Sequence, residues 1–173
     1  MIKLLRRLSA DQKGASAIEF AIVFPLLFLL HIAAAEALQA YIAQRNVAHI
    51  ATAMADITAR NRTISTAELN DILGASVSMI HPFPNERLQQ RVSSLSADNN
   101  GSVSTDWTSK KDYTVGDNPS VPSGYLRANE SVIVTDVIYD YEPTFGFFMP
   151  DTIRMTRRAY VRPRLSTKVE KVS

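Results

Sequence analysis

One apolar stretch near the N terminus limits what this chain of 173 residues can fold into. No polar side chain interrupts residues 20–30, and His31 is the only clearly polar residue before Glu36. A helix over residues 15–35 would rise about 31 Å, at roughly 1.5 Å per residue, which is enough to cross a hydrocarbon core of about 30 Å. The sequence therefore predicts a membrane-spanning helix.

Basic residues precede this stretch and are opposed by one acid, Asp11. They are Lys3, Arg6, Arg7 and Lys13. Residues 1–14 thus carry +3, and because the formal net charge of the whole chain is +2, the remainder carries −1. Positive charge beside a span is typically cytoplasmic. We therefore expect these residues to set the membrane topology, with the N terminus in the cytoplasm and the bulk of the chain outside.

A single carboxylate, Glu19, lies at the start of the apolar stretch. An ionised carboxylate in lipid costs roughly 2.5–3.5 kcal/mol at the bilayer centre, so it normally has a partner. If the chain were cut after Gly14, the new amine on Ala15 would lie one helical turn from Glu19. The two could pair within the chain or between neighbouring subunits. Gly14 would also suit a protease that needs an extended, accessible backbone.

The residues around this carboxylate read Gly-Ala-Ser-Ala-Ile-Glu-Phe-Ala-Ile-Val-Phe-Pro-Leu-Leu. This segment resembles the TadE/TadF-like minor pseudopilins of the tight-adherence (Flp) pilus system, with Gly14, Glu19, Phe20 and Pro25 in one register. The resemblance implies cleavage between Gly14 and Ala15 by a prepilin peptidase. It further implies assembly with other pilins and pilus platform proteins at the bacterial inner membrane, with a periplasmic head. Incorporation into the extracellular filament is left open.

Pro25 falls inside the predicted span. It removes a backbone donor and should kink the helix, which membrane helices tolerate. The chain is too long for a major Flp subunit, which typically has Glu-Tyr where this chain has Glu19-Phe20.

The helical pattern continues beyond Glu36, with apolar residues at alternating spacings of three and four. They are Ala40, Ala43, Val47, Ile50, Met54 and Ile57. We expect one helix over residues 15–60, about 68 Å long at the standard rise, whose second half packs on the chain's own globular part. Alternatively, a seam of small residues, Ala33, Ala40, Ala43 and Ala48, would admit another helix closely.

The rest of the chain predicts a small antiparallel sheet, so the expected fold class is α+β and pilin-like. A capping box at Ser65 and Glu68 predicts a short helix that ends at Gly74, followed by an extended linker at residues 81–84. Strands are expected over residues 88–96, 103–107, 131–141 and 153–161, with a turn at 97–101 and a long surface loop at 109–127. The expected domains are a basic leader (1–14), the long helix (15–60), a short helix and linker (61–85) and a β-rich head (86–173).

The loop 143–150, between the last two strands, carries Phe145, Phe147 and Phe148. It would either contact another subunit or the membrane surface, or fold over its own core, which is more usual. The last strand is rich in arginine (Arg154, Arg157, Arg158, Arg162 and Arg164) and follows a strand that bears Asp136, Asp140 and Glu142. Cross-strand charge pairing explains this pattern more simply than phosphate binding, and we expect no nucleic-acid partner.

No catalytic or metal-binding pattern stands out, and we expect no enzyme activity and no cofactor. Cysteine is absent, so neither disulfides nor thiolate metal sites are available. The competing interpretation is an uncleaved inner-membrane-anchored periplasmic scaffold or interaction protein. A periplasmic enzyme, as a third class, would need an acidic or histidine pocket.

Overall fold

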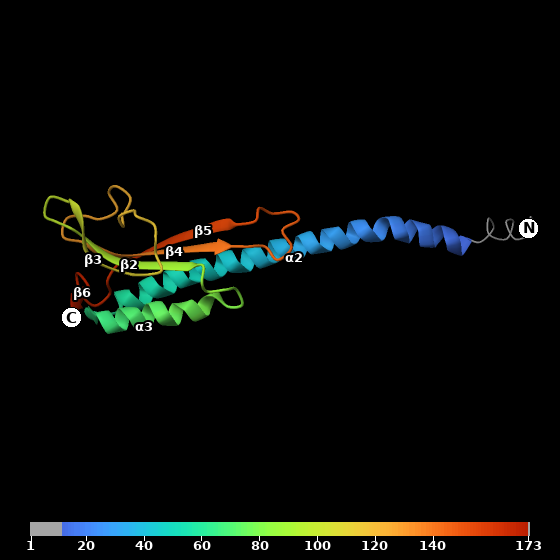
Figure 1. Ribbon diagram of the computed structural model, residues 1–173. Helices are drawn as coiled ribbons and strands as arrows, with labels where there is room; N and C mark the ends of the chain where they lie inside the picture. The colour runs from blue at the N-terminus through green and yellow to red at the C-terminus, as the bar shows by residue number, and fades with distance from the viewer. Residues whose placement is uncertain (1–11, 173) are drawn as a thin grey trace, which may run out of the picture.

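The computed structural model describes residues 12–172. A long helix leads into a small head of strands and one further helix (Figure 1). In chain order the elements are α2 (Gln12–Ala59), β1 (Thr63–Ser65), α3 (Thr66–Val77), the 3-10 helix η1 (Ser78–Ile80), β2 (Leu88–Ala97), β3 (Val103–Lys111), β4 (Ser131–Tyr141), β5 (Ile153–Val161) and β6 (Glu170–Val172). The expected α+β fold, a long apolar helix followed by a small antiparallel sheet, is confirmed.

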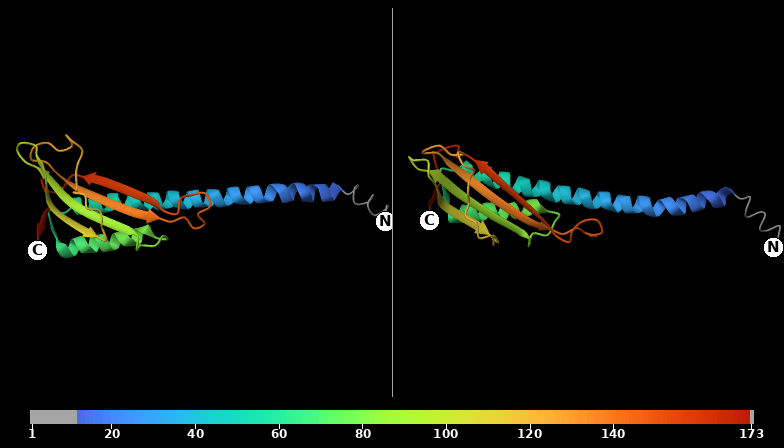
Figure 2. Two further views of the ribbon diagram at one scale, coloured as in Figure 1. Left: turned by 45° about the horizontal axis from the view of Figure 1, so that its top comes forward. Right: turned by 90° about the horizontal axis from the view of Figure 1, so that it is seen from above.

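Helix α2 has 48 residues and runs without interruption from the apolar stretch into the head. At about 1.5 Å per residue it is about 70 Å long. Its C-terminal half lies against the sheet, whereas its N-terminal half projects away from the head (Figures 1 and 2). One helix therefore serves both as the apolar segment and as the core of the head.

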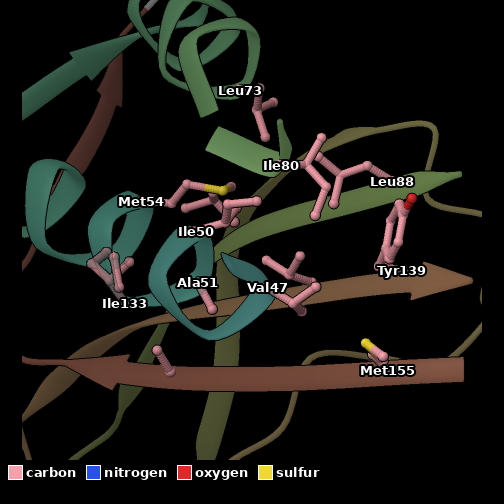
Figure 3. Close-up of a cluster of buried hydrophobic side chains, with 14 of the residues drawn as sticks. Val47, Ile50, Ala51, Met54, Leu73, Ile80, Leu88, Ile133, Tyr139 and Met155 are labelled. Atoms are coloured by element: carbon pink, nitrogen blue, oxygen red, sulfur yellow. The ribbon is translucent and has the colours of Figure 1, made fainter. Parts of the chain in front are cut away.

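The four-stranded antiparallel sheet has the order β3-β2-β4-β5. Helix α2 packs against β4 and β5, while α3 lies beside α2 and contacts β3, so the two helices cover one face of the sheet (Figure 2). Side chains of α2 that include Val47, Ile50 and Met54 are completely or almost completely buried there with Ile133 and Tyr139 of β4 (Figure 3). This burial confirms that the amphipathic half of α2 packs on its own domain.

One hydrogen bond fixes α2 on the sheet in addition to this apolar packing. The hydroxyl of Thr135 on β4 donates to the carbonyl oxygen of Ala51 on α2 at 2.7 Å, and both residues are buried. The bond therefore sets the height of the sheet along the helix.

A ladder of buried charges crosses the other face of the sheet. Arg91 on β2 lies opposite Asp136 on β4, with Nη2 of the arginine 2.6 Å from Oδ2 of the aspartate. Arg158 on β5 lies opposite the same aspartate and donates to its other carboxylate oxygen. Asp117, from the loop after β3, accepts from Arg91 at 3.2 Å, and the guanidinium lies 4.4 Å from the ring centroid of Tyr113. The loop thus closes over a paired charge network.

The expected cross-strand pairing is confirmed for two of the three acids of β4 and its end. Asp136 pairs with Arg158, and Asp140 forms two hydrogen bonds with Arg154, at 2.7 and 3.0 Å. Glu142 instead pairs with Arg87, which lies just before β2.

No sequence pattern predicts the short parallel pair of β1 and β6. Thr63 lies opposite Glu170, and the C-terminal segment reaches the end of α2, where the backbone N–H of Arg164 donates to the carbonyl of Ala59 at 2.9 Å. The indole N–H of Trp107 donates to the carbonyl of Val169 at 2.8 Å. The end of the chain is therefore part of the head's packing.

Three local expectations were wrong. Helix α3 continues through Gly74 to Val77, because a glycine inside a helix costs only about 1 kcal/mol and does not force the helix to end. Its capping box at Ser65 and Glu68 is present as expected. The segment 81–84 turns rather than extends, because the N–H of Phe83 donates to the carbonyl of Ile80 at 3.1 Å. Ile57 is 49% exposed, because the buried face of α2 continues through Ala55 and Thr58 instead.

Candidate membrane-spanning and processing segment

The N-terminal half of α2 exposes nearly all of its apolar side chains. Every residue from Ser16 to His31 is exposed, and the segment passes the length and hydropathy criteria for a membrane span, with none of its most apolar window buried in the head. A monomer in water rarely leaves so large an apolar surface uncovered. This part of α2 has the physical character of a lipid-facing helix, as the sequence predicts.

Gly14 and Glu19 lie on the first turns of α2. Gly14 is helical, so the extended backbone that would suit a protease at this position is not observed, and cleavage would require the first turn to unwind. Glu19 is exposed, and none of the ion pairs among the described side chains involves it. The carboxylate is thus available to a partner from outside the chain or to a new N terminus on Ala15.

Pro25 does not interrupt α2. Because proline lacks an N–H, the carbonyl of Ala21 has no i+4 donor, and the N-terminal half of the helix follows a gentle curve in all three views (Figures 1 and 2). The rings of Phe20, Phe24 and Phe28 follow one another along one face of this half, with centroids 5.4 and 5.9 Å apart. The helix therefore continues through the proline without interruption.

Glu36 ends the apolar stretch and holds the loop 143–150, which we call the aromatic loop. Oε1 of Glu36 accepts the backbone N–H groups of Phe145, at 2.9 Å, and Gly146, at 2.7 Å. Gly146 has a φ of +67°, a left-handed conformation that glycine adopts without a steric penalty and that lets two successive N–H groups converge on one oxygen. Glu36 is 1% exposed, so this acid is a structural part of the head rather than a surface charge.

The model of the family described as "TadE-like protein" matches residues 14–56. Residues 14–56 are therefore similar to TadE-like proteins. Searches of curated proteins and of solved structures returned no match.

The TadE-like segment starts at Gly14 and ends within the buried half of α2. It therefore covers both the lipid-facing half of the helix and most of the half that forms the core of the head. The head's strands lie outside the matched residues. The resemblance that the sequence suggested is confirmed for this segment.

The remaining site predictions fall in different places. Lys3, Arg6 and Arg7 lie outside the described residues. Lys13 and Ala15 lie within α2, and Phe20 is exposed on it.

The aromatic loop does not fold over the core: Phe145, Phe147 and Phe148 are 53%, 70% and 55% exposed. The more usual interpretation of this loop was wrong, and the loop instead presents its rings to the surroundings.

Sequence reasoning missed Glu36. Its signal was present, since it is the first acid after the apolar stretch, but no local pattern links it to a loop more than a hundred residues away. Among the residues that the structure describes, no group of three His, Asp or Glu side chains is arranged to hold a metal ion. Between residues 12 and 172, the candidate functional side chains are therefore those of α2 and of the aromatic loop beside it.

Proposed function

We propose that this chain is a minor pseudopilin of a tight-adherence pilus system. It would be inserted in the bacterial inner membrane through the N-terminal half of α2, with its N terminus in the cytoplasm and its head in the periplasm. The observation that carries the proposal is the TadE-like segment that begins at Gly14 and coincides with an uncovered apolar half-helix. The similarity to TadE-like proteins favours a role in the tight-adherence system.

The proposed mechanism begins with removal of the basic leader. A prepilin peptidase cuts between Gly14 and Ala15 and leaves a new amine four residues before Glu19. One turn of helix separates the two groups, about 6 Å along the axis. The carboxylate then neutralises an N-terminal amine in its own chain or in a neighbour, so that the helix can leave the bilayer and enter a bundle with other pilins and the assembly platform.

The head contributes shape rather than chemistry in this proposal. Its charged side chains are mostly committed to ion pairs, such as Arg91 with Asp136 and Arg162 with Glu130. We assign it a structural part in assembly and no catalytic residue or cofactor.

The helical conformation of Gly14 favours one alternative, an uncleaved anchor that presents the head as a periplasmic scaffold. The mature N terminus separates the two. Mass spectrometry of the chain purified from cells with an intact peptidase should find Ala15 as the first residue, and a strain without the peptidase should retain Met1. A leader retained in both strains would overturn the proposed processing and support the uncleaved anchor.

A further inference from the structure

The aromatic loop carries an exposed apolar cluster at one end of the head. Phe147 is the most exposed of its three phenylalanines, and the rings of Phe145 and Phe147 stack with centroids 6.4 Å apart and planes 8° from parallel. Stacking of two rings above a glycine turn fixes their direction, so they form a defined apolar tip. Exposed apolar rings are unfavourable in water, so such a tip indicates a partner that covers it.

The hydrogen bonds from Phe145 and Gly146 to Glu36 set the height of this tip along α2. Glu36 is the first acid after the apolar stretch, which spans about 30 Å between Ser16 and Ala35 at the helical rise. The loop is also the part of the head that reaches farthest toward the N terminus of α2 (Figures 1 and 2). The tip therefore lies at the level where a spanning α2 would leave the hydrocarbon core.

The charges next to the loop follow the order found at a bilayer surface. A groove of about 570 Å³ beside the loop runs between α2 and β5 and includes Tyr41, Met149, Arg154 and Arg157 in its lining. Since β5 runs away from the loop, the two arginines lie on the head side of the apolar tip. Apolar rings toward the core and arginines toward the water match acyl chains below lipid phosphates.

We propose that the aromatic loop inserts its phenylalanines into the membrane surface on the head side, next to the point where α2 emerges. The partner is the lipid bilayer itself. This inference rests on the proposed membrane insertion of α2. The loop gives the head a second point of attachment and so holds it in one orientation against the membrane before assembly.

The absence of cysteine from the chain permits a direct test with single cysteine substitutions in the full-length protein. A nitroxide label is placed at Phe147→Cys, at Phe24→Cys within the apolar half of α2, and at Leu165→Cys, which is exposed elsewhere on the head. Each variant is reconstituted at low density in vesicles of phosphatidylethanolamine and phosphatidylglycerol. Collision rates with dissolved oxygen, which concentrates in lipid, and with a water-soluble nickel chelate then report the depth of each label.

The label at Phe147→Cys should show an oxygen-to-nickel collision ratio several-fold above that at Leu165→Cys. Like the label at Phe24→Cys, it should report a lipid environment. If Phe24→Cys reads as lipid while Phe147→Cys matches the aqueous control, the loop inference is overturned and membrane insertion stands. An aqueous reading at Phe24→Cys would overturn the insertion of α2 itself. Spin–spin broadening at Phe147→Cys that disappears on dilution with unlabelled protein would identify a second copy as the partner and also overturn the lipid proposal.

Discussion

The backbone N–H of Gly146 donates a hydrogen bond of 2.7 Å to the carboxylate of Glu36, although 110 residues separate the two in sequence. Burial raises the pKa of the neighbouring Tyr141, and the negative charge of Glu36 raises it further. The contact joins the end of the apolar stretch to the connection between β4 and β5. It thus determines where the head sits on the helix.

Replacing Glu36 tests this contact. Glu36→Ala should release the aromatic loop, because a hydrogen bond to a charged group contributes about 1.5–3 kcal/mol. Loss of this free energy corresponds to amide exchange at residues 145 and 146 that is roughly 10- to 150-fold faster. Glu36→Gln keeps a hydrogen-bond acceptor, so amide exchange at these residues should increase less than in Glu36→Ala. Gln39→Ala, which removes only the exposed bond from Thr144, is the control and should leave exchange at Phe145 unchanged. Equal exchange in Glu36→Ala and the natural chain would contradict the proposed clamp.

The charge ladder predicts unequal effects for two acids on the same strand. Asp136→Asn should lower the free energy of unfolding by about 3–5 kcal/mol, because it removes the buried carboxylate that pairs with both Arg91 and Arg158. Asp140→Asn breaks the exposed pair with Arg154 and should cost at most about 1 kcal/mol. Denaturant unfolding of the detergent-solubilised chain, followed by Trp107 fluorescence, measures both. Similar losses for the two variants would show that burial does not govern the ladder.

Acid should destabilise the head. The hydrogen bond from Arg154 lowers the pKa of Asp140. At Asp117, burial raises the pKa, but hydrogen bonding and the charge of Arg91 outweigh it, so the pKa of Asp117 is also lowered. A lowered pKa means that the unfolded chain binds more protons. The contribution of these two carboxylates to stability is therefore fully present above the ordinary Asp pKa of about 3.9 and is lost as the pH falls through their lowered pKa values.

Unfolding midpoints measured across this range check the expectation. In Asp140→Asn the decline should be shallower, since one of the contributing carboxylates is gone. A decline in that variant as steep as in the natural chain would show that the pair with Arg154 does not contribute.

Two isoleucines about two turns apart on α2 should respond differently to truncation. Ile50 is fully buried, so Ile50→Ala should cost about 2–5 kcal/mol through lost burial and a residual cavity. Ile57→Ala removes an exposed side chain and should change stability by less than about 0.5 kcal/mol. The same denaturant measurement separates them, and a large loss for Ile57→Ala would mean that this face of α2 is covered in the folded protein.

The proposed role of Glu19 predicts a defect in assembly without a defect in processing. Glu19→Ala and the isosteric Glu19→Gln should both still be cut after Gly14 but fail to support pilus production, because neither can neutralise the amine. Glu19→Asp keeps the charge and should retain part of the activity. Sheared surface pili and the mass of the mature N terminus are the two measurements. Normal piliation in Glu19→Gln would rule out the electrostatic role.

Much of the fold follows from local patterns. The bounds of β4 match those expected from its dense apolar residues, and the bounds of β5 match those expected from apolar residues on one face. The capping box at Ser65 places the start of α3. Helix α2 was predictable because the apolar stretch is followed directly by a helical pattern of apolar residues. These features depend on near neighbours in the sequence, where periodicity and capping chemistry act directly.

What the sequence did not reveal depends on distant residues. The burial of Arg91 on an otherwise polar strand arises only when Asp136 and the loop bearing Asp117 close over it. The pairing of β1 with β6 involves three residues on each side, too few to give an alternating pattern. The exposed aromatic loop was unexpected because Glu36, not the core, supplies its contacts.

The continuity of α2 has a mechanical consequence. No hinge or linker separates the half that faces lipid from the half buried under β4 and β5, and Thr135 locks the sheet to the helix at Ala51. Any rotation or axial pull applied to the apolar end is therefore delivered to the head as a rigid-body movement. In the proposed assembly, extraction of the helix from the bilayer would therefore move and reorient the head at the same time.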